Sequence, residues 1–305
     1  MKAGDGASTT IRPGSGCEGR VRMGLSEAQV AAWRQNGFLS PFPLLTVEER
    51  QKCLLGLKRF ETWLGGPVNN VAEMKWRTMP YLLLPWAARL ARDPRILDRV
   101  EPLLGPDLLI YTSTFFIKEP HSPSIAAWHQ DSTYYGLTPA DVVTVWIALT
   151  DASETAGCIE ALPFDETPRQ MRHRARVVEN SVNRAAQVIV DPVDDARATP
   201  MPLKAGAFSM HHGLSPHRSG PNRSGGRRIG LGLNFIPTHV RTTGGKQPAA
   251  MLVRGTDRFG HFELLQPPET ELDDAAVRTH AHAVGLYRDN YVEQEAKHAA
   301  WVGAE

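Results

Sequence analysis

The residues from Leu108 to Lys118 most constrain the fold, because this stretch is dense in β-branched and aromatic residues and predicts a β-strand. Further strands are predicted, between turns rich in Gly, Pro and Asp, at residues 142–149, 186–190, 207–212 and 228–236. No helical patterns alternate with these strands. The sequence therefore favours an antiparallel sandwich or jelly roll over a parallel sheet.

Helices are predicted before and after this β-rich part. Ser26 is a typical N-cap for a first helix that Gly37 would end, and Thr46 to Glu49 has the spacing of a capping box for a second. A third is expected from Asp93-Pro94 to Gly105, and one or two more from Asp273 onward. Residues 1–24 are rich in Gly, Ser and Thr and are expected to be a flexible tail. Residues 25–305 are expected to form a single, mainly β domain with flanking helices.

The overall composition favours a small-molecule partner. The 305 residues include 34 basic and 33 acidic ones, so no strong net field favours nucleic acid or an anionic membrane. No apolar run approaches the roughly 20 residues that a membrane span requires. The three cysteines, Cys17, Cys53 and Cys158, lie far apart, which is typical of reduced thiols in a cytoplasmic protein. The oligomeric state is left open.

The segment Trp128-His129-Gln130-Asp131 is the strongest candidate for a metal site. On an extended strand, side chains two positions apart point to the same side, so His129 and Asp131 would offer two ligands from one edge. A His-x-acid pair alone carries little weight, because a chain with 11 His and 33 acidic residues contains such a pair by chance. The aromatic residues around this pair favour a lined pocket.

A third ligand is sought among His211, His212 and His217, of which His212 and His217 have an Arg eleven residues further on. Arg223, which follows His212, lies in a turn-forming stretch and cannot be aimed reliably. Arg228, which follows His217, begins a predicted strand and shares a face with the small residues Gly230 and Gly232, which would leave room for a ligand. His217 is therefore favoured, and His211 and His212 are expected to be core residues or supports of the ligands.

Two imidazoles and a carboxylate on one face of an octahedral ion suit ferrous iron and leave three positions open. A 2-oxo acid can occupy two of these positions and O2 the third. The far carboxylate of the acid then needs a fixed cation, for which the planar fork of Arg228 is suited. Ser219, two residues after His217, would add a hydroxyl donor to the same carboxylate.

At these residues the sequence resembles the phytanoyl-CoA dioxygenase family of Fe(II)- and 2-oxoglutarate-dependent oxygenases. The segment from Trp128 to Asp131 is similar to the proximal metal motif of that family. The segment from His217 to Ser224, followed by Arg227-Arg228, is similar to the distal motif. The likeness runs from about residue 37 to about residue 237, and it implies a double-stranded β-helix with flanking helices.

The resemblance also implies roles for individual residues. His129, Asp131 and His217 would bind iron, while Arg228 and Ser219 would hold 2-oxoglutarate beside Trp146. Thr112 stands at a 2-oxoglutarate contact where many members have Gln. After Cys158, where the family often has Pro-Gly-Ser-His, this chain has residues 163–166, Pro-Phe-Asp-Glu.

The expected reaction is hydroxylation of a C–H bond of a small metabolite, either an amino acid derivative or a natural-product intermediate. The acidic Asp131 favours hydroxylation over halogenation, because related halogenases have a small residue there. Desaturation, cyclisation or epimerisation at the same iron, and a metal-binding or ligand-binding jelly roll without turnover, remain alternatives. A zinc hydrolase on the same ligands is disfavoured, since no general base is nominated. The arginine-rich residues 163–202 are expected to be a solvated loop rather than a lid over an anionic substrate.

Overall fold

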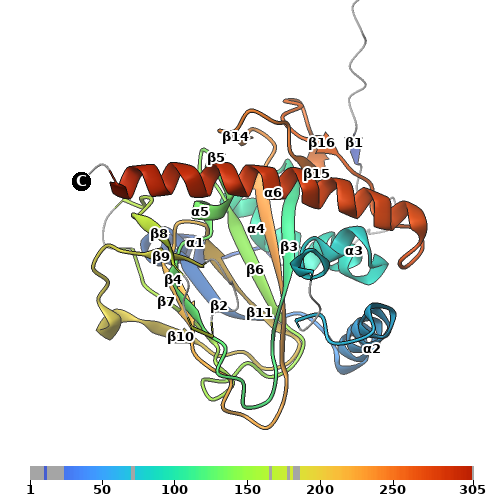
Figure 1. The fold of residues 1–305 in the computed structure, drawn as a ribbon, viewed down its shortest axis with the longest axis horizontal. Helices are drawn as coiled ribbons and strands as arrows, with labels where there is room; N and C mark the ends of the chain where they lie inside the picture. The colour runs from blue at the N-terminus through green and yellow to red at the C-terminus, as the bar shows by residue number, and fades with distance from the viewer. Residues whose placement is uncertain are drawn as a thin grey trace, which may run out of the picture.

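Strand β3 (Leu108–Lys118) lies near the middle of the larger of two main antiparallel sheets (Figure 1). The computed structural model describes residues 10–11, 24–69, 73–164, 167–176, 179–180 and 186–303. Within these residues the larger sheet has the order β1-β15-β3-β13-β6-β11-β2, with β16 beside β15. Its other strands are β1 (Thr10–Ile11), β2 (Phe38–Pro43), β6 (Val143–Ala148), β11 (Ala207–His212), β13 (Arg228–Pro237), β15 (Ala249–Thr256) and β16 (Glu263–Leu264).

The smaller sheet has the order β10-β7-β12-β4. Its strands are β4 (Ala126–His129), β7 (Ile159–Ala161), β10 (Thr199–Met201) and β12 (His217–Ser219). Two ribbons complete the β structure, β5 (Leu137–Thr138) with β14 (Arg241–Thr242), and β8 (His173–Arg176) with β9 (Ala186–Ile189). This is the antiparallel jelly roll that the sequence predicts.

Alternation along the central strands gives the larger sheet two buried faces. Val145 of β6 and Leu231 of β13 belong to the main core, which includes Phe60 from a covering helix. Trp146, the next residue along β6, packs instead with Ile159 of the smaller sheet. Because side chains alternate with a period of two, one face of these strands packs against the helices and the other face lines the space between the two sheets.

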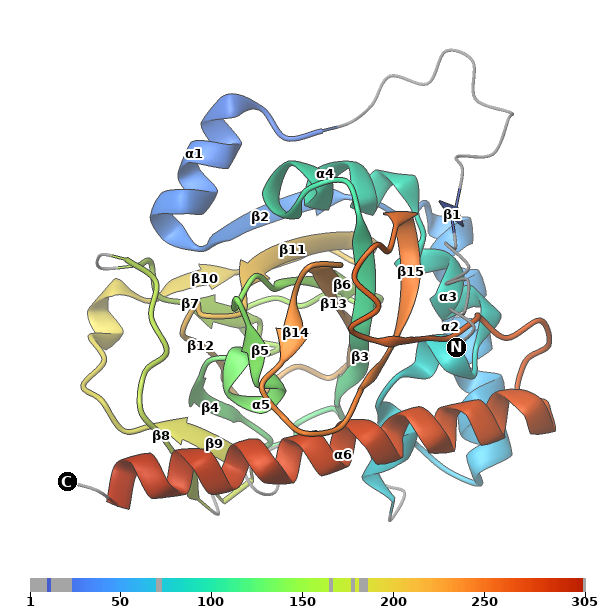
Figure 2. The same cartoon turned by 90° about the horizontal axis from the view of Figure 1, so that it is seen from above.

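Helices flank this β structure, and Figure 2 shows α1 and α4 on one side and α6 along the opposite side. The α-helices are α1 (Glu27–Asn36), α2 (Val47–Leu64), α3 (Pro85–Ala91), α4 (Pro94–Leu104), α5 (Ser132–Tyr135) and α6 (Asp274–Gly303). Short 3-10 turns are η1 (Met74–Arg77), η2 (Pro80–Leu82) and η3 (Asp195–Arg197). Helix α6 contacts α5, β8, β15 and η2, so the end of the chain is tied to several parts of the fold.

The predicted helix starts are confirmed. Ser26 and Thr46 each form a capping box, and the Asp93 side chain accepts a hydrogen bond from a backbone N–H at the start of α4. Within α2, Leu57 and Phe60 are buried, whereas Leu55 is exposed.

Two further expectations are tested only in part. Of the expected flexible tail, Thr10–Ile11 pair with β15, and residues 1–9 and 12–23 lie outside the described residues. Within residues 163–202, the strand predicted at 186–190 is confirmed as β9. The expectation that the rest is a solvated loop is wrong where the chain is described, because β8 and β10 also lie there. His173, in β8, is fully buried, and its Nε2 accepts a hydrogen bond from the backbone N–H of Gln130, next to His129.

In the described part of the chain, none of the helices is long and apolar enough to cross a membrane.

Candidate active site

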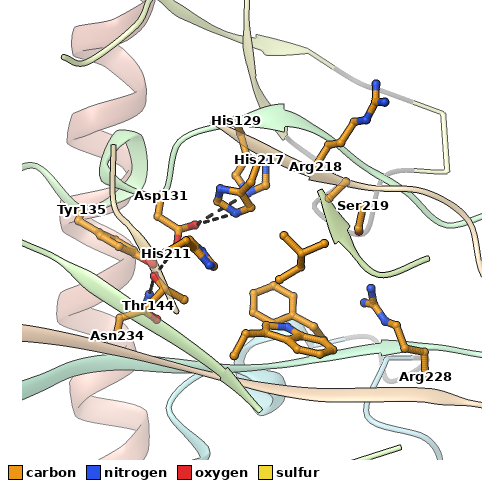
Figure 3. Close-up of a pocket in the computed structure, with 14 residues that line it drawn as sticks. His129, Asp131, Tyr135, Thr144, His211, His217, Arg218, Ser219, Arg228 and Asn234 are labelled. Atoms are coloured by element: carbon orange, nitrogen blue, oxygen red, sulfur yellow. Dashed lines mark hydrogen bonds and ion pairs between the residues drawn. The ribbon is translucent and has the colours of Figure 1, made fainter. Parts of the chain in front are cut away.

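Three side chains from two remote segments meet between the sheets, as Figure 3 shows. His129 is the last residue of β4, Asp131 follows it directly before α5, and His217 begins β12. Strands β4 and β12 are antiparallel neighbours in which His217 lies opposite His129. Asp131 Oδ1 lies 3.8 Å from His129 Nε2 and 3.7 Å from His217 Nε2. One ligand atom from each residue lies within 4.8 Å of the others, so the three can share one ion.

Both imidazoles are fixed in the tautomer that a metal requires. His129 Nδ1 donates to the Ala127 carbonyl at 2.8 Å, and His217 Nδ1 donates to the Ser215 carbonyl at 3.0 Å. A carbonyl oxygen only accepts, so the hydrogen is on Nδ1 and the Nε2 lone pair faces Asp131. Burial lowers the pKa of His129 and, with the neighbouring imidazoles, places the pKa of His217 well below its ordinary value. Both rings are therefore neutral and able to act as ligands.

The Asp131 carboxylate has one oxygen occupied and one available. Its Oδ2 accepts a hydrogen bond from Thr144 Oγ1 at 2.7 Å and another from His211 Nε2 at 3.3 Å. Asn234 Nδ2 in turn donates to Thr144 Oγ1 at 2.7 Å, so the Thr144 hydrogen is directed to Asp131. Burial raises the pKa of Asp131, but the hydrogen bond that His211 donates to the charged carboxylate opposes this effect, and the pKa stays below its usual value. Oδ1 is left as the oxygen that faces the two Nε2 atoms.

Arg228 lies at the other end of the same cavity. Its side chain is 3% exposed, its Nη1 donates to the Gly157 carbonyl at 2.6 Å, and its guanidinium carbon lies 5.3 Å from the centre of the Trp146 ring. Among the described residues, none of the carboxylates forms an ion pair with it, and its Nε has no hydrogen-bond partner. Burial lowers the pKa of Arg228 to about 10. A buried cation without a counter-ion is costly, so this guanidinium is suited to an anionic ligand.

The glycines beside Arg228 have a different use from the one predicted. A Cβ on Gly230 would lie 1.9 Å from the Trp146 ring, and one on Gly232 would lie 2.9 Å from the Phe116 ring. The prediction that these glycines leave room for a ligand is therefore wrong in detail. The room is filled by the two aromatic rings, which form the apolar wall of the cavity.

The cavity between the metal ligands and Arg228 is lined by residues from both sheets. The lining residues are Phe116, Ala126, His129, Asp131, Tyr135, Thr144, Trp146, Ile159, His211, His217, Arg218, Ser219, Arg228 and Asn234. The donor set of two neutral imidazoles and a carboxylate, with an unbalanced guanidinium beyond them, fits Fe(II) together with a chelating 2-oxo acid that has a second carboxylate.

Other predicted residues have distinct positions. Ser219 lines the cavity, whereas Thr112 is buried opposite Asn234 on the neighbouring strand and is not among the lining residues. His212 Nδ1 accepts from the Leu214 backbone N–H, and its ring packs on Trp33, away from the ligand cluster.

Sequence reasoning missed Thr144, whose hydroxyl donates to Asp131 Oδ2. It also did not assign His211 to Asp131, although alternation along the predicted strand 207–212 would have placed His211 on the inner face.

Comparison with known proteins identifies the family. The sequence model of the phytanoyl-CoA dioxygenase (PhyH) family matches residues 33–230, which include all three candidate metal ligands. The chain belongs to the phytanoyl-CoA dioxygenase family. The predicted family, the double-stranded β-helix and the cofactor set of Fe(II), 2-oxoglutarate and O2 are thereby confirmed.

Individual members of the phytanoyl-CoA dioxygenase family and solved structures are similar over different lengths. A probable alpha-ketoglutarate-dependent hypophosphite dioxygenase of Stutzerimonas stutzeri is 29% identical over 192 residues, which is 61% of this chain and 62% of that protein. The chain thus spans less than two thirds of the length of this relative. The ectoine dioxygenase of Bordetella bronchiseptica is 24% identical over 269 residues, 74% of this chain and 85% of that protein. The solved structure of the non-heme monooxygenase ThoJ has a TM-score of 0.77 at 30% identity, and the match covers 88% of this chain and 98% of that one.

Proposed function

We propose that this chain is an Fe(II)- and 2-oxoglutarate-dependent dioxygenase that hydroxylates a C–H bond of a small metabolite. The observation that carries the proposal is that a buried 2-His-1-carboxylate cluster and a buried guanidinium without a counter-ion line one cavity. Relatives named as an ectoine dioxygenase and as an L-proline trans-4-hydroxylase support an amino acid derivative as the substrate class, with a natural-product intermediate as the other candidate.

In this proposal the chain's own residues hold both components. His129 Nε2, His217 Nε2 and Asp131 Oδ1 would bind the iron, and Oδ2 is occupied by Thr144 and His211, so the carboxylate would bind through one oxygen. One-oxygen binding leaves more of the coordination sphere open for co-substrate and O2. When bound, iron with 2-oxoglutarate and O2 supplies the oxidant that cleaves a C–H bond, while 2-oxoglutarate becomes succinate and CO2.

Arg228 and Ser219 would bind the distal carboxylate of 2-oxoglutarate. Arg228 Nη1 donates to Gly157 and Nε has no hydrogen-bond partner, so Nε and the second terminal nitrogen would be the donors for bidentate binding of a carboxylate. Trp146 and Phe116 would pack against the carbon chain of the acid, and their rings exclude water from the reacting end of the site. Thr112 lies opposite Asn234 on the neighbouring strand and does not line the cavity, so we propose that it would affect 2-oxoglutarate only through Asn234.

Binding and turnover test this proposal separately. Under anaerobic conditions, adding Fe(II) and 2-oxoglutarate should give a weak visible charge-transfer band, and Asp131→Ala should abolish it. Under oxygen, succinate release should rise with the correct member of a panel of amino acid derivatives and natural-product intermediates. Absence of the band in the wild-type protein would contradict the proposal.

The product distinguishes hydroxylation from the alternatives at the same iron. Hydroxylation adds one oxygen atom to the substrate, desaturation and cyclisation remove two hydrogens, and epimerisation leaves the mass unchanged. A band without succinate release for any compound in the panel would favour a ligand-binding jelly roll. We also propose a cytoplasmic location, supported by the two free, buried cysteines Cys53 and Cys158.

A further inference from the structure

Lys118, the last residue of β3, is a second buried basic residue next to Arg228. Its side chain is 0% exposed, and in the β3–β13 pairing it lies directly opposite Arg228. Among the described residues, none of the carboxylates forms an ion pair with it. Burial, together with the charge of Arg228, lowers the pKa of Lys118 to about 6. Two neighbouring buried basic residues without a carboxylate partner suggest an anionic ligand that would favour the charged form of both.

The contacts of Lys118 point to Ser219. Lys118 Nζ lies 2.7 Å from Ser219 Oγ, 3.3 Å from the Ser219 carbonyl and 2.5 Å from the Gly220 carbonyl. Three oxygens match the three hydrogens of an ammonium group. When Lys118 is charged, Ser219 Oγ accepts from it, and the hydroxyl hydrogen of Ser219 is left to point to another acceptor.

We propose that Lys118 is a positioning residue for the co-substrate, because it fixes Ser219 so that the Ser219 hydroxyl donates to the distal carboxylate held by Arg228. This inference rests on the proposed function. Lys118 itself is not among the residues that line the cavity, so it acts through Ser219 and through its charge. A neutral Lys118 would instead accept the Ser219 hydrogen, and a carboxylate bound beside it favours the charged form.

The test measures binding of 2-oxoglutarate to the anaerobic, Fe(II)-loaded protein. Lys118→Met and Ser219→Ala should each raise the dissociation constant about tenfold, the cost of a lost hydrogen bond to a charged group. The double variant should bind no more weakly than either single variant, because both changes remove the same interaction. Fe(II) affinity should stay unchanged in all three.

A 2-oxo acid without a distal carboxylate provides the matched control. 2-Oxovalerate should bind equally well to Lys118→Met and to the wild-type protein. It has no distal carboxylate, so the Ser219 hydroxyl donates to the acid in neither complex. Equal weakening for both acids, or additive losses in the double variant, would mean that Lys118 is only structural and would overturn the inference.

Two further outcomes are separable. If Lys118→Met does not fold, Lys118→Leu, which also has no hydrogen-bond donor, replaces it with the same expectations. If the wild-type protein itself gives no band with 2-oxoglutarate, the proposed function fails. If the wild-type band is normal and the Lys118 variant binds 2-oxoglutarate with an unchanged dissociation constant, only this inference is refuted.

Discussion

Replacing Arg228 by Met should weaken co-substrate binding without destabilising the protein. Most buried side chains contribute to stability, so a substitution that harms only binding is unusual. Arg228 is expected to behave in this way because its guanidinium is buried without a carboxylate partner among the described residues. Methionine keeps a side chain of similar length that can pack against Trp146.

The size of each effect follows from the contacts. The pKa of Arg228 is lowered from 12.5 to about 10, so at pH 7, below both values, the folded state carries the whole cost of about 3 kcal/mol. The substitution removes this cost and loses the hydrogen bond to Gly157, worth about 1 kcal/mol, which leaves a gain of about 2 kcal/mol in the free energy of unfolding. Loss of a buried charge partner should weaken 2-oxoglutarate binding by about 2 to 5 kcal/mol, which is roughly 30-fold to several thousand-fold.

Arg227 is a matched control in the adjacent position. Its guanidinium lies 2.7 Å from Glu61 and 3.0 Å from Glu119, and its side chain is partly exposed. Arg227→Met should lower the free energy of unfolding by about 1 kcal/mol and leave 2-oxoglutarate binding unchanged. Urea denaturation of the metal-free proteins measures the first quantity, and anaerobic titration of the Fe(II)-loaded proteins measures the second.

A clear loss of stability in Arg228→Met would refute the reasoning, because it would mean that Arg228 has a stabilising partner inside the protein. Unchanged 2-oxoglutarate binding would refute its role as the carboxylate anchor. The same binding defect in Arg227→Met would show that the two arginines act only through general charge.

Three further predictions concern the metal site and its support. Asp131→Ala should remove a ligand and abolish Co(II) or Fe(II) binding at micromolar metal, measured by equilibrium dialysis, while Arg228→Met should bind metal normally. Thr144→Val should weaken metal binding by about 10-fold to 100-fold, because Asp131 Oδ2 loses its shortest hydrogen bond, and unchanged affinity would contradict that role. His173 is buried and neutral with its pKa lowered from 6.5 to about 3, so the unfolded chain binds a proton that the folded one does not, and stability falls as the pH falls below 6.5. His173→Gln should reduce the slope of unfolding free energy between pH 6 and pH 4 by about 1.4 kcal/mol per pH unit, and an unaltered slope in urea titrations would exclude His173 as the cause.

The local elements were predictable because their signals lie within short stretches of sequence. The capping residues Ser26 and Thr46 and the strand Leu108–Lys118 depend on neighbours a few positions away, and they occur where predicted. The short strands of the smaller sheet were not all predictable, because strands of three or four residues such as β7 and β12 are defined by their partners.

The sequence by itself determined which residues can carry the chemistry of this protein. Two imidazoles, one carboxylate and a strand-borne arginine are recognisable from residue type and from alternation along a strand. Only the tertiary structure decided what surrounds them. The packing of the two sheets sets Lys118 against Ser219 across 101 positions and Thr144 against Asp131 across 13, and burial leaves Arg228 without a counter-ion among the described residues. Such contacts depend on register and packing between remote segments, which a single sequence does not specify.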